Sequence, residues 1–97
     1  MTLREFQDSI GETYLDKDSR RGLFESYAWL VEEVGELAGA LRHGKPEELA
    51  HEFSDCLAWL ASLANMAGVS LEEAAQRYAG GCPRCGASPC ECEDASH

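Results

Sequence analysis

Two pairs of acidic residues are spaced so that each pair can act together on a helix. Glu33 and Glu36 lie in the run EEVGE, and Glu52 and Asp55 lie in the run EFSD. Residues three apart are neighbours on a helix surface, so the members of each pair project together. Hard divalent cations prefer oxygen ligands, and Mg²⁺ held by few carboxylates keeps positions for water and phosphate oxygens. One such pair alone is more often a solvated acidic surface than a metal site.

The apolar residues around these acids indicate that the two pairs meet. At about 100° per residue, both pairs lie on the same rotational flank of an apolar stripe. When two helices pack as an antiparallel hairpin, flanks of the same sense face the same side. We therefore expect the four carboxylates to converge, where their repulsion requires cations, protons or full solvation. The stripes are Leu23, Tyr27, Leu30, Val34, Leu37 and Leu41, and Leu49, Phe53, Cys56, Leu60, Leu63 and Ala67.

The apolar pattern predicts four helices and no convincing strand, which places the chain in the all-α class. The connection Gly44–Lys45 is short enough to predict an antiparallel hairpin of the second and third helices. Thr2 with Glu5, and Ser70 with Glu73, have the spacing of a capping box. The expected helices run from about Leu3 to Leu15, from after Ser19 to about His43, from Pro46 to Gly68, and from after Ser70 to Gly80.

The length and charge of the chain limit its class. With 97 residues it has one small domain, and its net charge of −10 argues against nucleic acid as an electrostatic partner. It has no apolar run near the roughly 20 residues of a membrane span, and its N-terminus lacks the apolar core of a signal peptide. We expect a cytoplasmic protein with no membrane partner. Trp29, Leu57 and Trp59 widen the apolar faces, so we expect a homodimer or homotetramer to complete the four-helix bundle.

The acidic runs and the apolar residues between them resemble the MazG-type family of all-α nucleotide pyrophosphohydrolases. The family signature is EExxE followed by ExxD, and WLVEEVGELAGAL and ELAHEFSDCLAWLASLAN contain both within roughly residues 20–80. The resemblance implies that residues 1–81 form a catalytic domain that splits an NTP or dNTP into the monophosphate and pyrophosphate. Such an activity would clear non-standard or surplus nucleotides. It also implies Mg²⁺, or Mn²⁺ in its place, held by Glu33, Glu36, Glu52 and Asp55.

For several other residues, the resemblance to the family suggests a role but the sequence allows alternatives. Glu32 is a ligand of a second cation, the base that takes a proton from water, or a surface glutamate. Trp59 lies one turn after the ExxD motif and either stacks on a nucleobase or belongs to the core or an interface. Asn65, Lys45 and Arg77 lie where polar residues of the family contact base or phosphates, and otherwise they are surface residues.

One histidine motif points to a different metal site and is set aside. Glu48 and His51 form a single Glu-x-x-His, the motif of di-iron helical bundles. That site needs two such motifs on different helices, and the second is absent from the sequence. His43 and His51 are therefore expected to be surface residues.

The C-terminal residues 82–97 form a tail that carries four of the five cysteines. Their spacing is Cys82-x2-Cys85-x4-Cys90-x-Cys92, which in a reducing compartment indicates a metal site before disulfides. The run CPRCG is typical of a zinc-knuckle turn, and four thiolates satisfy tetrahedral Zn²⁺. The Cys-x-Cys spacing of the second pair is unusual for such a site. Redox-active thiols and a mobile tail are the alternatives.

Two functions are therefore compatible with the sequence. The first is a metal-dependent NTP pyrophosphohydrolase. The second is a non-enzymatic helical oligomer whose zinc-knuckle tail engages a protein partner and whose acids are plain surface. The complete set of acids favours the enzyme.

Overall fold

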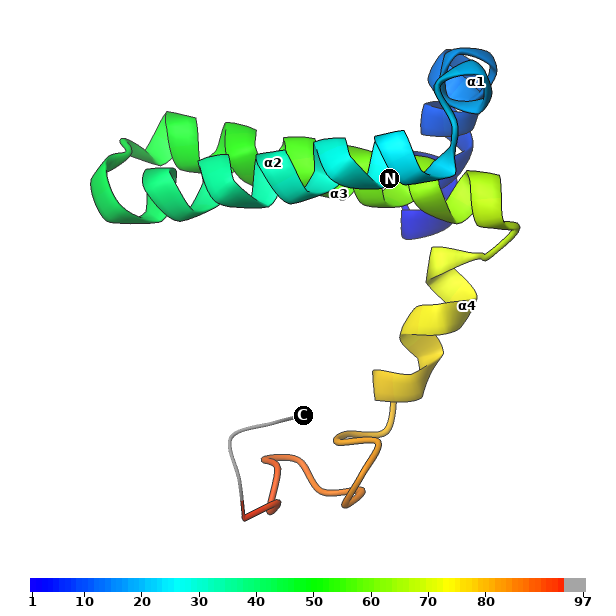
Figure 1. Ribbon diagram of the computed structural model, residues 1–97. Helices are drawn as coiled ribbons and strands as arrows, with labels where there is room; N and C mark the ends of the chain where they lie inside the picture. The colour runs from blue at the N-terminus through cyan, green and yellow to red at the C-terminus, as the bar shows by residue number, and fades with distance from the viewer. Residues whose placement is uncertain (94–97) are drawn as a thin grey trace.

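A helical hairpin crossed by a third helix makes up most of the structure, a computed structural model that describes residues 1–93 (Figure 1). Helix α1 spans Leu3–Arg21, α2 Leu23–His43, α3 Pro46–Ala67 and α4 Leu71–Ala75, and the 3₁₀ turn η1 spans Gln76–Tyr78. The predicted all-α class and the α2–α3 hairpin are confirmed, and residues 1–93 contain no strand. None of the helices in this part of the chain has the length and apolar character that crossing a membrane requires. The last four residues of the expected tail, 94–97, lie outside the described part.

The first helix is longer than predicted. It continues to Arg21 instead of ending at Leu15, so α2 begins only at Leu23 and not directly after Ser19. The Asp18 side chain is buried, and its Oδ1 accepts a hydrogen bond from Arg21 Nη1 at 2.7 Å. Gly22 then ends α1 at a φ of 97°, a backbone conformation that glycine adopts readily. Residues 16–19 were predicted to connect two helices. They are helical instead, and Asp18 among them pairs with Arg21 one turn later.

The hairpin turn depends on a close approach of the backbone at Gly44. The Gly44 N–H donates to the carbonyl of Ala40 at 2.7 Å, and the residue itself is extended rather than left-handed. A Cβ at Gly44 would lie 2.6 Å from that carbonyl oxygen, so a larger residue would force the turn open. Pro46 then begins α3, as predicted.

The helix start signals are confirmed at α1 and only partly at α4. Thr2 Oγ1 accepts the N–H of Glu5 at 3.0 Å, and the Glu5 carboxylate accepts the N–H of Thr2 at 2.8 Å. At α4, Ser70 Oγ accepts the N–H of Glu73 at 3.2 Å, but the carboxylate does not return the bond. The fourth helix, predicted to fade at Gly80, is an α-helix only to Ala75 and continues as the 3₁₀ turn η1 to Tyr78. Most of its side chains are exposed, and a helix without a buried face has little to stabilise it.

A buried glutamine joins α1 to the end of α3 and the start of α4. Gln7 is 7% exposed, and its Nε2 donates to Asn65 Oδ1 at 3.0 Å and to the Val69 carbonyl at 2.7 Å. Its Oε1 accepts the N–H of Leu71 at 2.8 Å. Asn65 Nδ2 in turn donates to the Gln7 carbonyl at 3.1 Å. Polar contacts rather than apolar packing therefore fix the start of α4.

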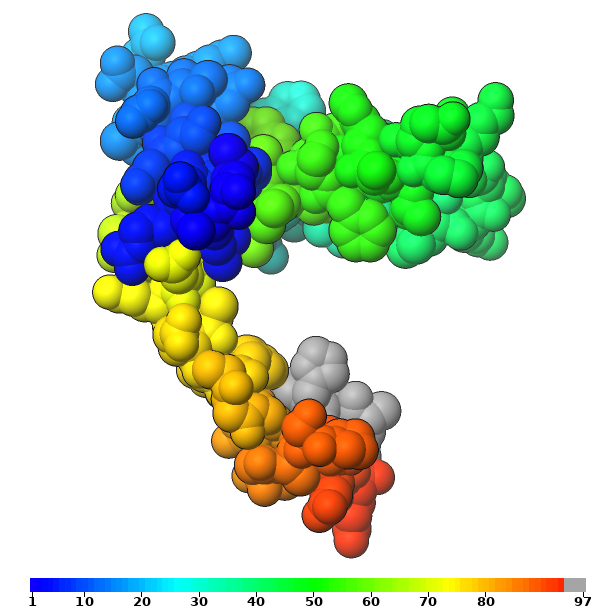
Figure 2. All heavy atoms as spheres, turned by 180° about the vertical axis from the view of Figure 1, so that it is seen from behind, coloured from blue at the N-terminus to red at the C-terminus, as the bar shows by residue number. Residues whose placement is uncertain are grey.

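The apolar core of one chain is small. Among the described residues, Ala61 and Ala64 are the buried apolar side chains, and Leu41 and Phe53 of the expected stripes are 61% and 54% exposed. The radius of gyration is 15.5 Å, against about 12.5 Å for a compact domain of this length. Figure 2 shows the hairpin and the C-terminal segment as two arms that diverge from α1. Such exposed apolar faces are consistent with the expectation that a second copy completes the core.

Replacing Gln7 with alanine is expected to destabilise the bundle, because the Val69 carbonyl and the Leu71 N–H lose their partner. Each buried group left unpaired costs about 1–3 kcal/mol, and about 1 kcal/mol shifts the melting temperature of a domain this size by about 4–8 °C. Circular dichroism at a fixed protein concentration should show a fall of at least about 8 °C. Gln76→Ala removes only a 3.4 Å bond on the exposed η1, so its shift should stay below about 4 °C. Equal shifts of the melting temperature in both variants would show that the hydrogen bonds of Gln7 do not hold α1 to α3 and α4.

Candidate metal and nucleotide site

Three carboxylates from the two hairpin helices lie close together. Glu33 of α2 and Glu52 and Asp55 of α3 each place one carboxylate oxygen within 4.8 Å of the others. All three residues are partly buried. We call this group the carboxylate cluster. The antiparallel packing of α2 on α3 positions it, since residues on matching flanks of the two helices face the same side.

The carboxylate cluster has more negative charge than its surroundings compensate. Burial raises the pKa of Glu33, and the carboxylates of Asp55 and Glu52 raise it further. Glu52 Oε2 is buried and accepts no hydrogen bond. A buried carboxylate oxygen without a donor is costly, and a hard divalent cation would both satisfy that oxygen and relieve the repulsion. The donor set therefore fits Mg²⁺ or Mn²⁺.

Glu36 and Glu32 lie at the edge of the carboxylate cluster. Both are exposed on α2, and neither belongs to the group of ligand atoms within 4.8 Å. Both still contribute to the raised pKa of Glu33, Glu36 more than Glu32. The structure thus brings together three of the four predicted cation ligands. The part of Glu36 as a ligand, and that of Glu32 as a base or second-cation ligand, stay predictions.

His51 contacts the carboxylate cluster, which the sequence analysis did not foresee. Its side chain is 70% exposed, as expected of a surface histidine, but its Nε2 lies 3.3 Å from Asp55 Oδ2. The spacing of four residues on one helix was the signal that could have revealed this contact. A protonated imidazole would compete with a cation for the same carboxylate.

A pocket of about 210 Å³ opens beside the carboxylate cluster, between α1 and α3. Asp55 belongs to both the pocket and the cluster. The α1 side of the pocket was not predicted, because that helix was expected to end before Lys17 and Arg21. The lining residues are Tyr14, Lys17, Asp18 and Arg21 of α1, and Asp55, Ala58, Trp59 and Ser62 of α3.

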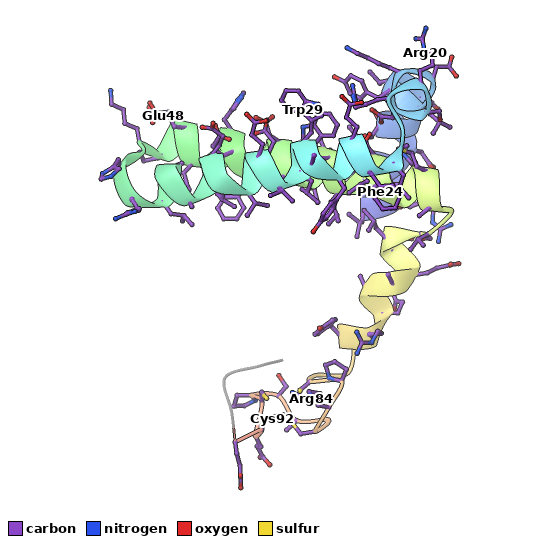
Figure 3. All side chains as sticks on the ribbon, viewed as in Figure 1. Arg20, Phe24, Trp29, Glu48, Arg84 and Cys92 are labelled. Carbon is purple, nitrogen blue, oxygen red and sulfur yellow. The ribbon has the colours of Figure 1, made fainter. Side chains whose placement is uncertain are left out.

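Trp59 lies against two flat groups at the wall of this pocket. The Trp29 ring of α2 is nearly parallel to it, with the ring centroids 6.0 Å apart and an interplanar angle of 10°. The Arg21 guanidinium carbon lies 4.8 Å from the Trp59 ring centroid. Figure 3 shows Trp29 on the face of the hairpin from which α1 rises. Trp59 therefore packs between helices and also lines a pocket, while its contact with a base stays a prediction.

The other predicted substrate contacts do not line this pocket in a single chain. Asn65 uses its amide to bond with Gln7. Lys45 caps the start of α3 at the far end of the hairpin and is exposed. Arg77 lies on η1, with its guanidinium carbon 5.7 Å from the Tyr78 ring centroid. Contact of these three residues with substrate stays a prediction.

The chain matches the model of a known protein family. The family model described as MazG nucleotide pyrophosphohydrolase domain matches residues 24–80, more than half of the chain. The matched region contains α2 and α3 except for Leu23, and with them the carboxylate cluster, Glu32 and Glu36. It includes neither α1 nor the four cysteines of the tail. No curated protein matches the chain significantly.

Replacing Glu33 with glutamine is expected to raise the melting temperature of the chain at pH 7 in a chelating buffer. Because the folded-state pKa of Glu33 is raised, its proton stabilises the fold at low pH, and this stabilisation is lost as the pH rises through the folded pKa. The neutral variant avoids that loss. About 1 kcal/mol would correspond to about 4–8 °C, and the gain over wild type should shrink as the pH is lowered and wild-type Glu33 takes up its proton.

The matched control is Glu12→Gln, an exposed position on α1. That variant should have the melting temperature of wild type at each pH, and so should Glu33→Gln if neither burial nor the neighbouring carboxylates raised the pKa of Glu33.

Proposed function

Because this chain belongs to the MazG nucleotide pyrophosphohydrolase family, we propose that it hydrolyses NTPs or dNTPs to the monophosphate and pyrophosphate with Mg²⁺ or Mn²⁺. The observation that carries the proposal is the buried Glu52 Oε2, which has no hydrogen-bond donor and lies in a helix pair lined with acids. Purely structural acids would be solvated or paired. The role that follows is the removal of non-standard or surplus nucleotides.

The role proposed for each acidic residue depends on where it lies relative to the carboxylate cluster. Glu33, Glu52 and Asp55 would hold the cation, and Glu36 would support it from the edge of the carboxylate cluster. Such a cation, when bound, neutralises charge on phosphate oxygens and lowers the pKa of a coordinated water. Glu32 is exposed on the same helix, where it takes a proton from the attacking water or holds a second cation.

The pocket between α1 and α3 supplies the contacts to the nucleotide. Trp59 offers a flat surface for the base, and Lys17 and Arg21 bring positive charge near the place where a triphosphate would meet the cation. Arg21 is already paired with the buried Asp18, so Lys17 carries the less compensated charge. The volume of about 210 Å³ is below the roughly 300–1,000 Å³ of pockets that enclose whole small ligands. One chain therefore accommodates part of a nucleotide.

The alternative function is a non-enzymatic helical oligomer with a protein-binding tail. It would account for the exposed apolar faces and the cysteines. It offers no reason for three carboxylates to meet with one oxygen buried and unpaired. The enzyme is therefore the better explanation.

The first prediction concerns the reaction. With Mg²⁺ and an NTP, phosphate should be released only after inorganic pyrophosphatase is added, and a chelator should abolish the release. Asp55→Asn and Glu52→Gln should lower kcat by at least about 10²-fold, the size of a lost electrostatic contact in catalysis.

The matched control for these variants is Asp16→Asn on the exposed part of α1, which should leave kcat unchanged. Direct release of orthophosphate with a nucleoside diphosphate would refute the proposed reaction, and full activity in Asp55→Asn would refute the ligand assignment.

A second prediction separates stacking on substrate from packing. Trp59→Leu should raise KM by about 5-fold or more, because stacking of a base on an aromatic ring contributes about 1–3 kcal/mol. Trp29→Leu removes the same ring pair but no part of the pocket wall, so its KM should change much less. If both variants raise KM equally, Trp59 acts through packing alone.

The third prediction concerns assembly into a homodimer or homotetramer, which we propose from the half-exposed apolar stripes. Sedimentation velocity at micromolar concentration should show no folded species smaller than a dimer. A folded monomer of 10.6 kDa would contradict the proposal.

A further inference from the structure

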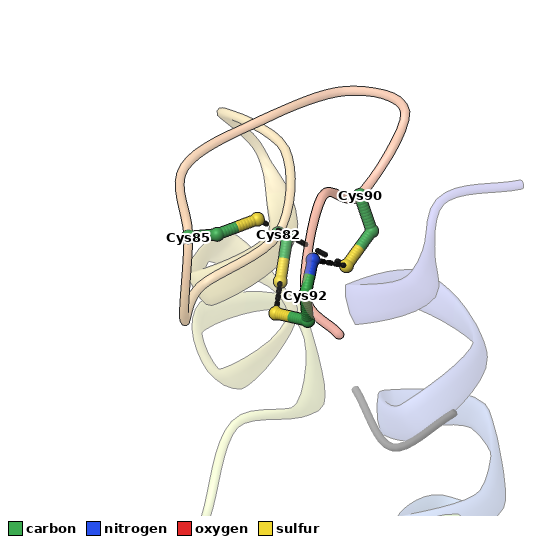
Figure 4. A group of neighbouring side chains, drawn as sticks. All are labelled: Cys82, Cys85, Cys90 and Cys92. Carbon is green, nitrogen blue, oxygen red and sulfur yellow. Dashed lines mark hydrogen bonds between the residues drawn. The ribbon is translucent and has the colours of Figure 1, made fainter. Parts of the chain in front are cut away.

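The four cysteines of the C-terminal segment place their sulfur atoms together (Figure 4). The Sγ atoms of Cys82 and Cys92 are 3.8 Å apart, those of Cys85 and Cys90 are 3.9 Å apart, and all four lie within 4.8 Å of one another. Tetrahedral Zn²⁺ with Zn–S bonds of about 2.3 Å requires sulfur atoms about 3.8 Å apart. The two closest pairs therefore already have the spacing of opposite edges of such a tetrahedron.

Tight turns of the backbone produce this arrangement. The Gly86 N–H donates to the Cys82 carbonyl at 2.7 Å, and the Cys82 N–H donates to the Ala87 carbonyl at 3.0 Å. Gly86 has a φ of 75°, which glycine adopts without a steric cost. These bonds hold Cys82 and Cys85 on one side of the CPRCG turn. The unusual Cys-x-Cys pair then reaches across, with Cys92 against Cys82.

Backbone N–H groups point at the sulfur atoms. The Arg84 N–H donates to Cys82 Sγ at 3.4 Å, and the Glu91 N–H donates to Cys85 Sγ at 3.3 Å. Such bonds favour thiolate over thiol, and thiolate is the form that binds metal.

We propose that Cys82, Cys85, Cys90 and Cys92 bind one structural Zn²⁺ per chain. The four soft sulfur ligands select Zn²⁺ over Mg²⁺, whereas the carboxylate cluster offers only hard oxygens, so the two sites take different metals. Binding replaces the thiol protons and leaves a centre of formal charge −2 with no open position, which is a structural rather than a catalytic site. The family match ends at residue 80, so this site is an addition to the nucleotide-hydrolysing domain.

The zinc would supply the stability that packing does not. Of the described residues in this segment, most are exposed, and the structure shows no buried apolar side chain among them. A segment of this kind gains its order from metal binding, and the free energy of binding becomes free energy of folding.

The test measures zinc in the full-length chain, purified under reducing conditions, supplied with Zn²⁺ and desalted. Elemental analysis should give about one zinc per chain. The double variant Cys82→Ser/Cys85→Ser should retain less than a tenth of that amount, because two of four ligands are lost. Cys56→Ser changes the fifth cysteine, on α3, and should retain the full amount. Glu52→Gln should retain it as well, because it alters only the carboxylate cluster.

Two further measurements on the same samples distinguish a zinc site from the alternatives, which are redox-active thiols and a mobile tail. Replacement of Zn²⁺ by Co²⁺ should give the charge-transfer and ligand-field absorption of a tetrahedral thiolate site in wild type and Cys56→Ser, but not in the double variant. Alkylation of the four thiols should slow by at least tenfold when zinc is bound. Undiminished zinc in the double variant, substoichiometric zinc in wild type, or alkylation that zinc does not slow would each overturn the proposal.

Discussion

Repulsion between carboxylates that face one another across the α2–α3 hairpin is the constraint around which the structure is arranged. The apolar seam of the hairpin brings Glu33, Glu52 and Asp55 together, although burial and like charge raise the pKa of Glu33. The buried Glu52 Oε2 has no donor, so packing alone leaves the arrangement electrostatically incomplete. The proposed cation would complete it, and would thereby link the stability of this helix pair to the proposed function.

The charged end of α1 complements this negative centre. Asp18 is buried and pairs with Arg21, which holds the Arg21 guanidinium over the Trp59 ring and next to the pocket. Lys17 lines the same pocket. Lys17 and Arg21 on the α1 wall and Asp55 of the carboxylate cluster on the α3 wall are a distribution that suits a cation–triphosphate complex. The same extension of α1 therefore serves both the packing of the bundle and the proposed substrate site.

Helical periodicity and a short connection were enough to predict that acids of α2 and α3 converge, because the angle per residue is nearly constant. The spacing alone did not reveal that Glu36 lies at the edge, because Glu52 and Asp55 have the same spacing of three residues and both belong to the carboxylate cluster. The length of α1 was underestimated because its last residues are polar and carry no apolar stripe, although Asp18 and Arg21 have the spacing of a local i,i+3 pair. The contacts of Gln7 could not be predicted, because its partners lie 58 to 64 residues away in the sequence.

The two groups of candidate metal ligands lie apart, with carboxylate oxygens on the hairpin and sulfur atoms beyond η1. The proposed function depends on binding of a divalent cation by the carboxylate cluster. Electron paramagnetic resonance of Mn²⁺, with the full-length chain and no nucleotide, tests it most directly through the loss of the free-ion signal. We expect saturable binding by wild type and binding weakened by at least about tenfold in Glu52→Gln, as for loss of a metal-site residue. Equal binding by both proteins would contradict this expectation.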